Sequence, residues 1–495
     1  MKRLVSLILL ASLLVCQAVG CSKPAEESEK PQTGSTQSQT ENPADGQEPE
    51  PEETVDPRLA VSDDLPDKTF DGKSLKIASE PHVCYEIVSE ELTGENTNDI
   101  IYNRNLNIGK RFEAKIESVP VGDAANSAMM TAAAGTRDFD VISLINYKSG
   151  SAIANQSFDN WYDIPCVDLT KPWWCTLINS NCTINGKAYT ITGDLAVTAL
   201  TYTIAMFFDQ KVCEDWGYSA DSLYKKVYDN EWTIDKFTAM VDGIYTDNNG
   251  NGEKDKDDTF GIGTNRCDTI DVWLSAFDQP VTGRDEDGFM TIALVDEKTV
   301  NVLEKLIALL NRSPGAFLQY AETWDERNYF KQDRLAFCPL SFDECFSTLR
   351  EMESAYGILP MPKYDAAQQN YLTTLIDEVS MFGVMRPVPE DELEFVGILF
   401  TALNAESYRE VYPVYYDVAL KNKYSEDPET AKMIDLIMDG RTFDLGFTFG
   451  VSYLSRFPYC IRDLVQQGST DIASTFAAMQ GMLDSGLAII NGVYQ

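Results

Sequence analysis

The stretch "DNNGNGEKDKDD", residues 247–258, places oxygen-bearing side chains at alternate positions. Aspartate or asparagine stands first, third, fifth, ninth and twelfth, and a glycine stands sixth. In calcium loops of this spacing the alternate side chains converge on one ion, the seventh residue offers its backbone carbonyl, and the glycine permits a sharp turn. The spacing therefore predicts a structural Ca²⁺ site. Its expected ligands are Asp247, Asn249, Asn251, Glu253, Asp255 and Asp258.

Two features set this loop apart from a complete EF-hand. The twelfth residue is Asp258 where glutamate is usual, which resembles the loops of dockerins, and its shorter side chain makes bidentate contact with the ion harder. The next residues, "TFGIG", are typical of an extended segment rather than a second helix. The expectation is thus a half EF-hand that supports a lobe. An Asn-Gly-rich surface turn without metal is the alternative interpretation.

The sequence holds no familiar catalytic motif. G-x-S-x-G, H-E-x-x-H, a Walker loop and a strand followed by G-x-G-x-x-G are all absent. His82 is the only histidine and is interpreted as a loop or cleft-rim residue. The sequence therefore predicts a protein without catalytic residues. A glycoside hydrolase, which needs only two carboxylates, stays open as the enzymatic alternative because the chain has 78 acidic residues.

The charge of the chain limits its partners. A formal net charge of −38 argues against nucleic acid, since phosphate neutralisation needs clustered lysine and arginine. It favours a neutral or a cationic ligand over an anionic one. The cysteines form no C-x-x-C pair, so buried thiols are expected. Short-loop disulfides between Cys175 and Cys182, or between Cys338 and Cys345, are the alternative.

Strands and helices alternate through the first part of the body. Residues 74–79, 114–121 and 139–145 are expected to be strands, and residues 98–112 and 124–134 the helices between them. This order predicts right-handed crossovers and a parallel, doubly wound sheet. Further along, "KAYTITG", "TIAMFFDQ", "LAFCPL", "YGILPMP" and "VSMFGVM" are expected strands, and the chain from Glu390 on is mostly helical.

Ligand sites in open α/β sheets lie beyond the carboxyl ends of the strands. This rule selects Glu80 after the first strand, and Asn146 and Tyr147 after the third. It also selects Ser341 and Phe342 after "LAFCPL". We expect these residues to line a binding site.

A neutral ligand with apolar C–H groups and hydroxyls needs a site that combines aromatic rings with carboxylate or amide acceptors. Trp173 and Trp174 follow a proline in a stretch without helical period, and one of the two is expected to face ligand while the other packs in the core. Trp324 is a second candidate platform. Glu378, just before "VSMFGVM", is a candidate acceptor at a crossing between lobes.

The N-terminal residues predict the location of the protein. Two basic residues and an apolar run form a signal peptide over residues 1–20, too short to span a bilayer. The following "QAVGC" resembles the bacterial lipobox, whose cysteine, here Cys21, is lipidated after cleavage. Residues 21–66 are acidic, rich in proline, serine and threonine, and poor in large apolar residues, so a disordered tether is expected. The prediction is a lipid-anchored protein on the outer face of the cell membrane.

Several segments of the body together resemble one family. They are "NDIIYNRNLNIGKRFEAKI", "VDLTKPWW", "INGKAYTITGD", "EWTIDKF", "FKQDRLAFCPL", "YGILPMPKYD" and "AESYREVYPVYYDVALKNKY". The resemblance is to extracellular solute-binding lipoproteins of carbohydrate ABC importers, in the form common in Gram-positive anaerobes. It implies an α/β, two-lobed periplasmic-binding-protein-like fold of type II, with parallel sheets flanked by helices and a mostly helical C-terminal part.

The resemblance also implies a domain order and a function. The main part of the first lobe is expected over 67–190 and the second lobe over 191–375. Residues 376–495 are expected to cross back to the first lobe and form the C-terminal helices. The protein would be a monomer that binds a carbohydrate between the lobes and delivers it to the permease subunits of an ABC importer. A peptide-binding or cell-wall-associated lipoprotein is the alternative from another class.

Overall fold

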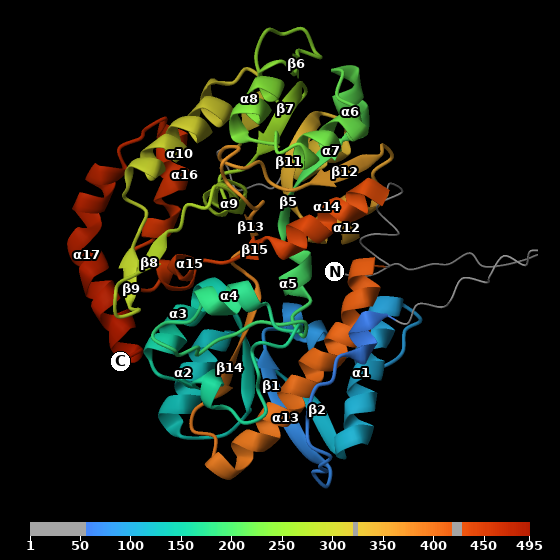
Figure 1. The fold of residues 1–495 in the computed structure, drawn as a ribbon, viewed down its shortest axis with the longest axis vertical. Helices are drawn as coiled ribbons and strands as arrows, with labels where there is room; N and C mark the ends of the chain where they lie inside the picture. Colours follow the sequence, from blue (N-terminus) through green and yellow to red (C-terminus); the bar gives the residue numbers. More distant parts are fainter. Residues whose placement is uncertain (1–55, 320–324, 418–427) are drawn as a thin grey trace, which may run out of the picture. The chain divides into compact units, whose positions relative to one another are not determined.

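In a computed structural model of the chain, residues 56–319, 325–417 and 428–495 are described. The predicted signal peptide, Cys21, most of the predicted tether and Trp324 lie outside the described residues. Two β-sheets organise the described part, and each is the centre of what we call a lobe (Figure 1).

The first lobe is built on a five-stranded sheet of order β2-β1-β3-β14-β4. Its strands are β1 Lys73–Ser79, β2 Ala114–Pro120, β3 Val141–Ile145, β4 Phe158–Asp159 and β14 Ser380–Met385. β1 pairs in parallel with β2 and β3, as the alternating pattern predicts. β14, however, is antiparallel to β3 and β4, so the prediction of a parallel sheet is wrong at this edge. The reason is that Ser380 at the start of β14 faces Ile145 at the end of β3, because the chain re-enters from the end at which β3 finishes.

The second lobe is built on a sheet of order β10-β7-β11-β5-β12, with β6 paired to β7. Its strands are β5 Ile204–Asp209, β6 Tyr245–Thr246, β7 Thr259–Thr264, β10 Ala316–Leu318, β11 Leu335–Ser341 and β12 Tyr356–Leu359. β7 runs parallel to β10 and β11, while β5 is antiparallel to β11 and β12, so this sheet is mixed as well. Successive β5 side chains enter two different buried clusters, with Phe207 in one and Phe208 in the other. Both faces of this sheet are therefore covered.

Helices cover the sheets with the signals that the sequence contains. α2 (Ala124–Ala134) begins where Asp123 accepts the backbone N–H of Asn126 over 2.9 Å, and it ends at Gly135 with φ of 64°. α1 (Asn96–Phe112) buries Ile101, Ile108 and Phe112 at helical spacing. The remaining helices up to residue 390 are α3 Asn146–Ala154, α4 Thr176–Asn181, α5 Thr198–Thr201, α6 Gln210–Asp215, α7 Ala220–Tyr228, α8 Ile234–Asp242, α9 Asp268–Ala276, α10 Glu297–Ile307, α11 Glu326–Lys331 and α12 Asp343–Phe346.

The segment "KAYTITG", residues 187–193, is not the predicted strand. Within it, Ile191 makes one isolated bridge with Phe382. The backbone N–H and carbonyl of Thr192 are bound instead by the side-chain amide of Asn179, over 2.9 Å and 2.8 Å. Because a side chain satisfies these groups, the segment needs no ladder of neighbouring strands. It leads through α5 into β5 and forms the first crossing between the lobes.

The part after residue 376 contributes to both lobes (Figure 1). α13 contacts α1 of the first lobe, α14 contacts β12 of the second, α15 contacts α3, and α16 contacts α9 and α10. α17 contacts α3 and also β9, a strand of the small hairpin β8–β9. The bounds are α13 Glu390–Glu406, α14 Pro428–Asp439, α15 Leu445–Gly450, α16 Cys460–Gln467, α17 Ile472–Val493, β8 Thr282–Arg284, β9 Met290–Ile292 and, in a separate two-stranded pair, β13 Thr373–Thr374 and β15 Arg441–Thr442.

The last residues of the predicted tether, 56–66, are held on the body. Asp63 accepts hydrogen bonds from Arg111 over 2.5 Å and from Arg409 over 3.3 Å. Val61 and Leu65 pack against the core. The predicted tether boundary at residue 66 is therefore wrong for these residues. They bury apolar side chains and make ion pairs that the composition of the segment does not predict.

Within the described residues, Cys175 is not bridged to Cys182, and Cys338 is not bridged to Cys345. Among the helices of the described ranges, none has the length and apolar character required to cross a bilayer.

Candidate functional site

A cavity of about 510 Å³ lies where the strands of both sheets end. Tyr147 reaches it from the start of α3, directly after β3. Ser341 reaches it from the end of β11, and Asp268 from the start of α9, after β7. The cavity is thus an interlobe cleft at the carboxyl ends of strands, the place where open α/β sheets bind ligands.

The two crossing segments form the floor between the lobes. The backbone N–H of Ile376 donates to the carbonyl of Tyr202 over 2.9 Å, which ties one crossing to the other. The backbone N–H of Tyr147 donates to the carbonyl of Asp377 over 3.0 Å. Tyr202, Ile376, Asp377 and Glu378 all line the cleft. These backbone hydrogen bonds therefore hold the chain at Tyr147, Tyr202 and Asp377 beside the cleft.

Glu86 joins the same two crossings from behind the cleft. Its buried carboxylate accepts the backbone N–H of Thr198 over 2.6 Å and the hydroxyl of Ser380 over 2.7 Å. Burial raises the pKa of Glu86 to about 7, against these two hydrogen bonds, which lower it. The guanidinium of Arg104 also lies close, but it donates to the carbonyls of residues 86 and 87 and to Ser407. One titratable side chain thus links both hinge segments.

The C-terminal segment closes one side of the cleft. The hydroxyl of Tyr459 donates to Asp377 over 2.7 Å. The guanidinium carbons of Arg456 and Arg462 lie 5.0 Å and 4.6 Å from the centre of the Tyr459 ring. Arg462 also donates to both carboxylate oxygens of Asp271, each over 3.0 Å from its Nε. The tyrosine is therefore held between two cations and a carboxylate.

Burial changes the acid–base properties of the cleft. It raises the pKa of Asp268 to about 7, and neighbouring Asp271 and Asp377 act in the same direction. It likewise raises the pKa values of Asp343 and Asp377. The pKa of Tyr202 rises to about 12, again mainly through burial, so its hydroxyl stays protonated. The site offers carboxylate acceptors, guanidinium donors and neutral phenols, a set that suits a hydroxyl-rich ligand.

The structure brings some of the predicted ligand residues to the cleft and places others away from it. Tyr147 and Glu378 line the cleft, as does Ser341 beside the predicted Phe342. Phe342 itself is buried, with its ring 6.4 Å from that of Phe207, because the chain turns its side chain into the lobe after β11. Glu80 lies outside the residues that line the cleft and accepts the backbone N–H of Ala124.

Asn146 and the tryptophan pair pack behind the cleft. Asn146 is fully buried and accepts the hydroxyl of Thr448 over 2.9 Å. Trp173 and Trp174 are 0% and 3% exposed, and Trp174 stacks on Phe400 at 6.0 Å. Neither indole face is open to a ligand, so the expectation that one of the pair faces the cleft is wrong. The segment that contains the two tryptophans runs along the core of the first lobe rather than along the edge of the cleft.

Several lining residues were not found by sequence reasoning. Asp268 follows β7, whose sequence "TFGIG" was recognised as extended, so the strand-end rule would have reached it. Asp377 adjoins the selected Glu378. Arg456, Tyr459 and Arg462 lie in a helical region far along the chain, and no local pattern in the sequence indicates that they meet the crossing segment.

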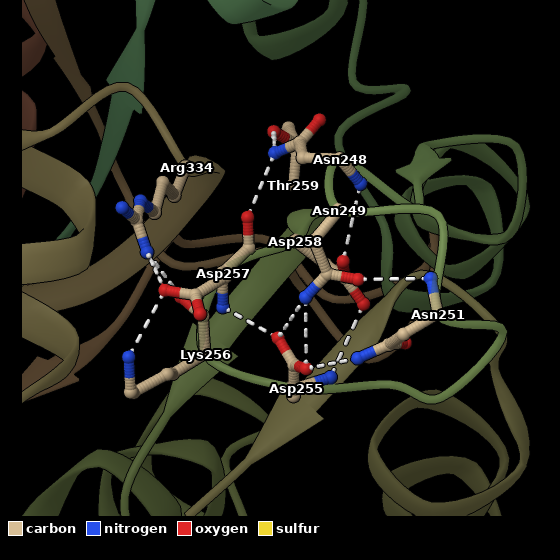
Figure 2. A network of polar contacts seen from close by, with 9 residues as sticks. All are labelled: Asn248, Asn249, Asn251, Asp255, Lys256, Asp257, Asp258, Thr259 and Arg334. Atoms are coloured by element: carbon tan, nitrogen blue, oxygen red, sulfur yellow. Dashed lines mark hydrogen bonds and ion pairs between the residues drawn. The ribbon is translucent and has the colours of Figure 1, made fainter.

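Figure 2 shows the part of the loop 247–258 that surrounds Asp255 and Asp258. Both carboxylate oxygens of Asp247 accept backbone N–H groups, from Gly250 over 2.6 Å and from Gly252 over 2.8 Å. These glycines have φ of 70° and 76°, which the sharp turn requires. Asp255 accepts the amides of Asn249 and Asn251, over 3.0 Å and 2.7 Å to one of its oxygens. The loop is therefore internally hydrogen-bonded.

The loop also contains a buried carboxylate. Asp258 is fully buried and accepts backbone N–H groups of Asn248 and Asp255, over 3.2 Å and 3.1 Å, and the hydroxyl of Tyr245 over 3.1 Å. Across the described residues, three or more His, Cys, Asp or Glu side chains nowhere gather closely enough to hold a metal. A calcium ion here would therefore also draw on asparagine and backbone oxygens.

A scan against family models finds no match, and a search of curated proteins finds none either. Among solved structures, a family 1 extracellular solute-binding protein from Bifidobacterium longum subsp. infantis has a TM-score of 0.51 at 14% identity, over 84% of this chain and 99% of that chain. The fold is that of type II periplasmic binding proteins.

Two other structures of this fold contain ligands. A cyclo/maltodextrin-binding protein complexed with maltotetraose has a TM-score of 0.53 at 13% identity, over 86% of this chain and 98% of that chain. An ABC transporter solute-binding protein from Thermotoga lettingae TMO, bound with α-D-tagatose, has a TM-score of 0.51 at 13% identity, over 85% and 100% of the two chains. At these identities the likeness establishes the fold of the present chain and leaves its ligand to its own residues.

Proposed function

We propose that this chain is an extracellular solute-binding protein that captures a sugar or oligosaccharide in the interlobe cleft and delivers it to the permease of an ABC importer. The observation that carries the proposal is the cleft of about 510 Å³ at the strand ends of both lobes. Its volume suits a small ligand, since ligand sites commonly measure about 300–1,000 Å³. Tyrosine rings, carboxylates and guanidinium groups around one space match the C–H faces and hydroxyls of a saccharide.

The hinge region supports reversible closure. Two crossing segments are joined to each other and to Glu86, and residues of both lobes line the cleft. Rotation about such a hinge would bring Ser341 and Asp343 of the second lobe toward Tyr147 of the first. Binding without turnover is part of the proposal, because no group in the cleft is assigned a catalytic role.

Isothermal calorimetry of the purified body with mono- and oligosaccharides, and with short peptides, tests the binding function. Saccharide binding that is saturable and weakened by Tyr202→Ala is the expected result. Binding of peptides alone would favour a peptide receptor. Release of reducing ends from an oligosaccharide, lost in Asp268→Asn, would favour a glycoside hydrolase instead.

We further propose that Cys21 carries a lipid that holds the protein on the outer face of the cell membrane, with the acidic residues before Asp56 as a spacer. The support is the sequence pattern around Cys21 alone. Metabolic labelling with a fatty acid, compared between wild type and Cys21→Ser, tests it.

A structural calcium ion in loop 247–258 is the last part of the proposal. Its support is the oxygen spacing, together with the turn that Asp247 holds at Gly250 and Gly252. An oxygen that accepts one N–H group keeps a second lone pair for a metal. The ion would replace the amide contacts that Asp255 now receives, and would stabilise the edge of the second lobe.

A further inference from the structure

The charges that line the cleft are unequal. Carboxylates outnumber guanidinium groups, and lysine is absent from the described lining. The carboxylates belong to Asp268, Asp343, Glu344, Asp377 and Glu378. The guanidinium groups belong to Arg327, Arg456 and Arg462. With a chain charge of −38, the rest of the molecule does not make up this deficit of positive charge.

The ion pairs increase the imbalance. Arg327 pairs with Glu344 over 2.7 Å, and Arg462 is engaged by Asp271, which lies behind the lining. Asp377 receives the neutral hydroxyl of Tyr459 and forms no ion pair within the described residues, while Arg462 and Arg456 act to lower its pKa. Within the described residues, Asp268, Asp343 and Glu378 have no ion-pair partner.

A ligand that carries positive charge would balance the excess of carboxylates in the cleft. Asp268 and Asp377 line the same cleft, and besides burial, which is the main cause, Asp271 and Asp377 raise the pKa of Asp268 while Arg462 lowers it, so ionising Asp268 and Asp377 together costs energy. A cation between them removes the repulsion and gains charge-assisted hydrogen bonds, which are about twice as strong as neutral ones. A uronic acid or a sulfated sugar would add to the repulsion instead.

The same cleft also offers a contact of the kind that a sugar hydroxyl uses. Ser341 is 5% exposed and lines the cleft, and in the described part of the chain its hydroxyl has no hydrogen-bond partner. Such a group needs a partner from the ligand when the lobes close. The cleft therefore has positions for a hydroxyl as well as for a cation.

We propose that the captured saccharide carries a protonated amine, as an amino sugar with a free ammonium group does, and that Asp268, Asp377 and Glu378 receive this group. The inference rests on the saccharide-binding function proposed above and specifies its substrate class. Ser341 binds a hydroxyl of the same ligand.

Three matched disaccharide sets test the proposal, with β-1,4, α-1,4 and β-1,3 linkages. Each set holds a glucose disaccharide, its glucosamine analogue and its N-acetylglucosamine analogue, so only the C2 substituent changes. Calorimetry at neutral pH and low salt should show the amine form binding about tenfold or more tightly than the hydroxyl form in at least one set. The preference should shrink as salt rises, because the contact is ionic.

Variants assign the effect to the cleft. Asp268→Asn and Glu378→Gln should each weaken binding of the amine form several-fold more than binding of the hydroxyl form, and so reduce the amine preference. Glu378 is exposed, so its variant is expected to fold even if Asp268→Asn does not. Asp215→Asn is the matched control, since it removes an exposed carboxylate from α6, outside the cleft lining.

The outcomes separate the two proposals. Hydroxyl or N-acetyl forms that bind as tightly as the amine form in every set would overturn the cationic ligand and keep saccharide binding. Binding of spermidine or trilysine without binding of any saccharide would overturn both. No binding of any saccharide in the three sets or in the wider sugar panel would likewise reject the proposed function and, with it, this inference.

Discussion

The hydroxyl of Tyr459 donates a hydrogen bond of 2.7 Å to the carboxylate of Asp377, and this contact joins the C-terminal segment to the crossing that leads into β14. Both residues line the cleft, so the contact sets the orientation of an acceptor for the ligand. It also lowers the pKa of Asp377 against the larger, raising effect of burial. A chain segment from the last tenth of the sequence therefore shapes the site.

Removing this contact should weaken ligand binding. In Tyr459→Phe the ring stays and the donor is lost, which leaves Asp377 without that partner. The expected cost is about 1–2 kcal/mol of saccharide affinity, read by calorimetry. Tyr162→Phe removes a hydroxyl that is exposed and outside the cleft lining, and should leave affinity unchanged. Equal affinities in wild type and Tyr459→Phe would contradict the role given to this bond.

Trp174 should act on stability rather than on affinity. Trp174→Ala removes a buried indole that stacks on Phe400, and a large-to-small change of this kind typically costs about 3–5 kcal/mol of the free energy of unfolding. Urea unfolding measures this loss. The protein that remains folded should bind saccharide with wild-type affinity. A large drop in affinity without loss of stability would place the indole in the cleft after all.

Glu86 should make stability depend on pH. Its pKa rises from the ordinary 4.5 to about 7 in the folded protein, so the folded state binds the proton more tightly than the unfolded chain. Protonated Glu86 therefore makes its full contribution to the free energy of unfolding below pH 4.5. This contribution falls as pH rises to about 7, by on the order of 3 kcal/mol.

Comparison with Glu86→Gln isolates this effect, because other buried carboxylates titrate in both proteins. The difference in free energy of unfolding between the two should change between pH 4.5 and 7 and stay constant above pH 8. Parallel curves across the whole range would show that Glu86 does not titrate in the hinge.

The calcium proposal predicts a change in melting temperature. An ion that binds only the folded state stabilises it by RT ln(1 + [L]/Kd), so millimolar calcium should raise the melting temperature and a chelator should lower it. Asp247→Ala should abolish the response. Asp287→Asn, in the exposed turn before β9, is a control that should keep it. A melting temperature indifferent to calcium and chelator would leave the loop as a hydrogen-bonded turn.

Lipid attachment has its own test. Wild-type protein expressed in a bacterial host should incorporate a labelled fatty acid and sediment with membranes, and Cys21→Ser should do neither. The body keeps its sugar binding in both, since Cys21 precedes the described residues. Label retained in Cys21→Ser would reject the anchor at this position.

The sequence predicts local structure well where one signal decides it. The helix predicted over 124–134 is α2, and the strand predicted over 139–145 contains β3. It fails where a distant segment decides. Thr192 is satisfied by Asn179 rather than by a strand, and β14 enters antiparallel because of the path that the chain takes between lobes. The tryptophans show the same limit, since periodicity does not distinguish a cleft edge from a core wall.

The position of β14 also has a consequence for biosynthesis. β4 (Phe158–Asp159) pairs only with β14 among the described strands, and β14 begins at Ser380. The first sheet therefore has an open edge at β3 until more than three-quarters of the chain has been made. Contacts of such long sequence separation form slowly, and unpaired edges invite aggregation meanwhile. The first sheet is therefore completed late, when β14 enters between β3 and β4.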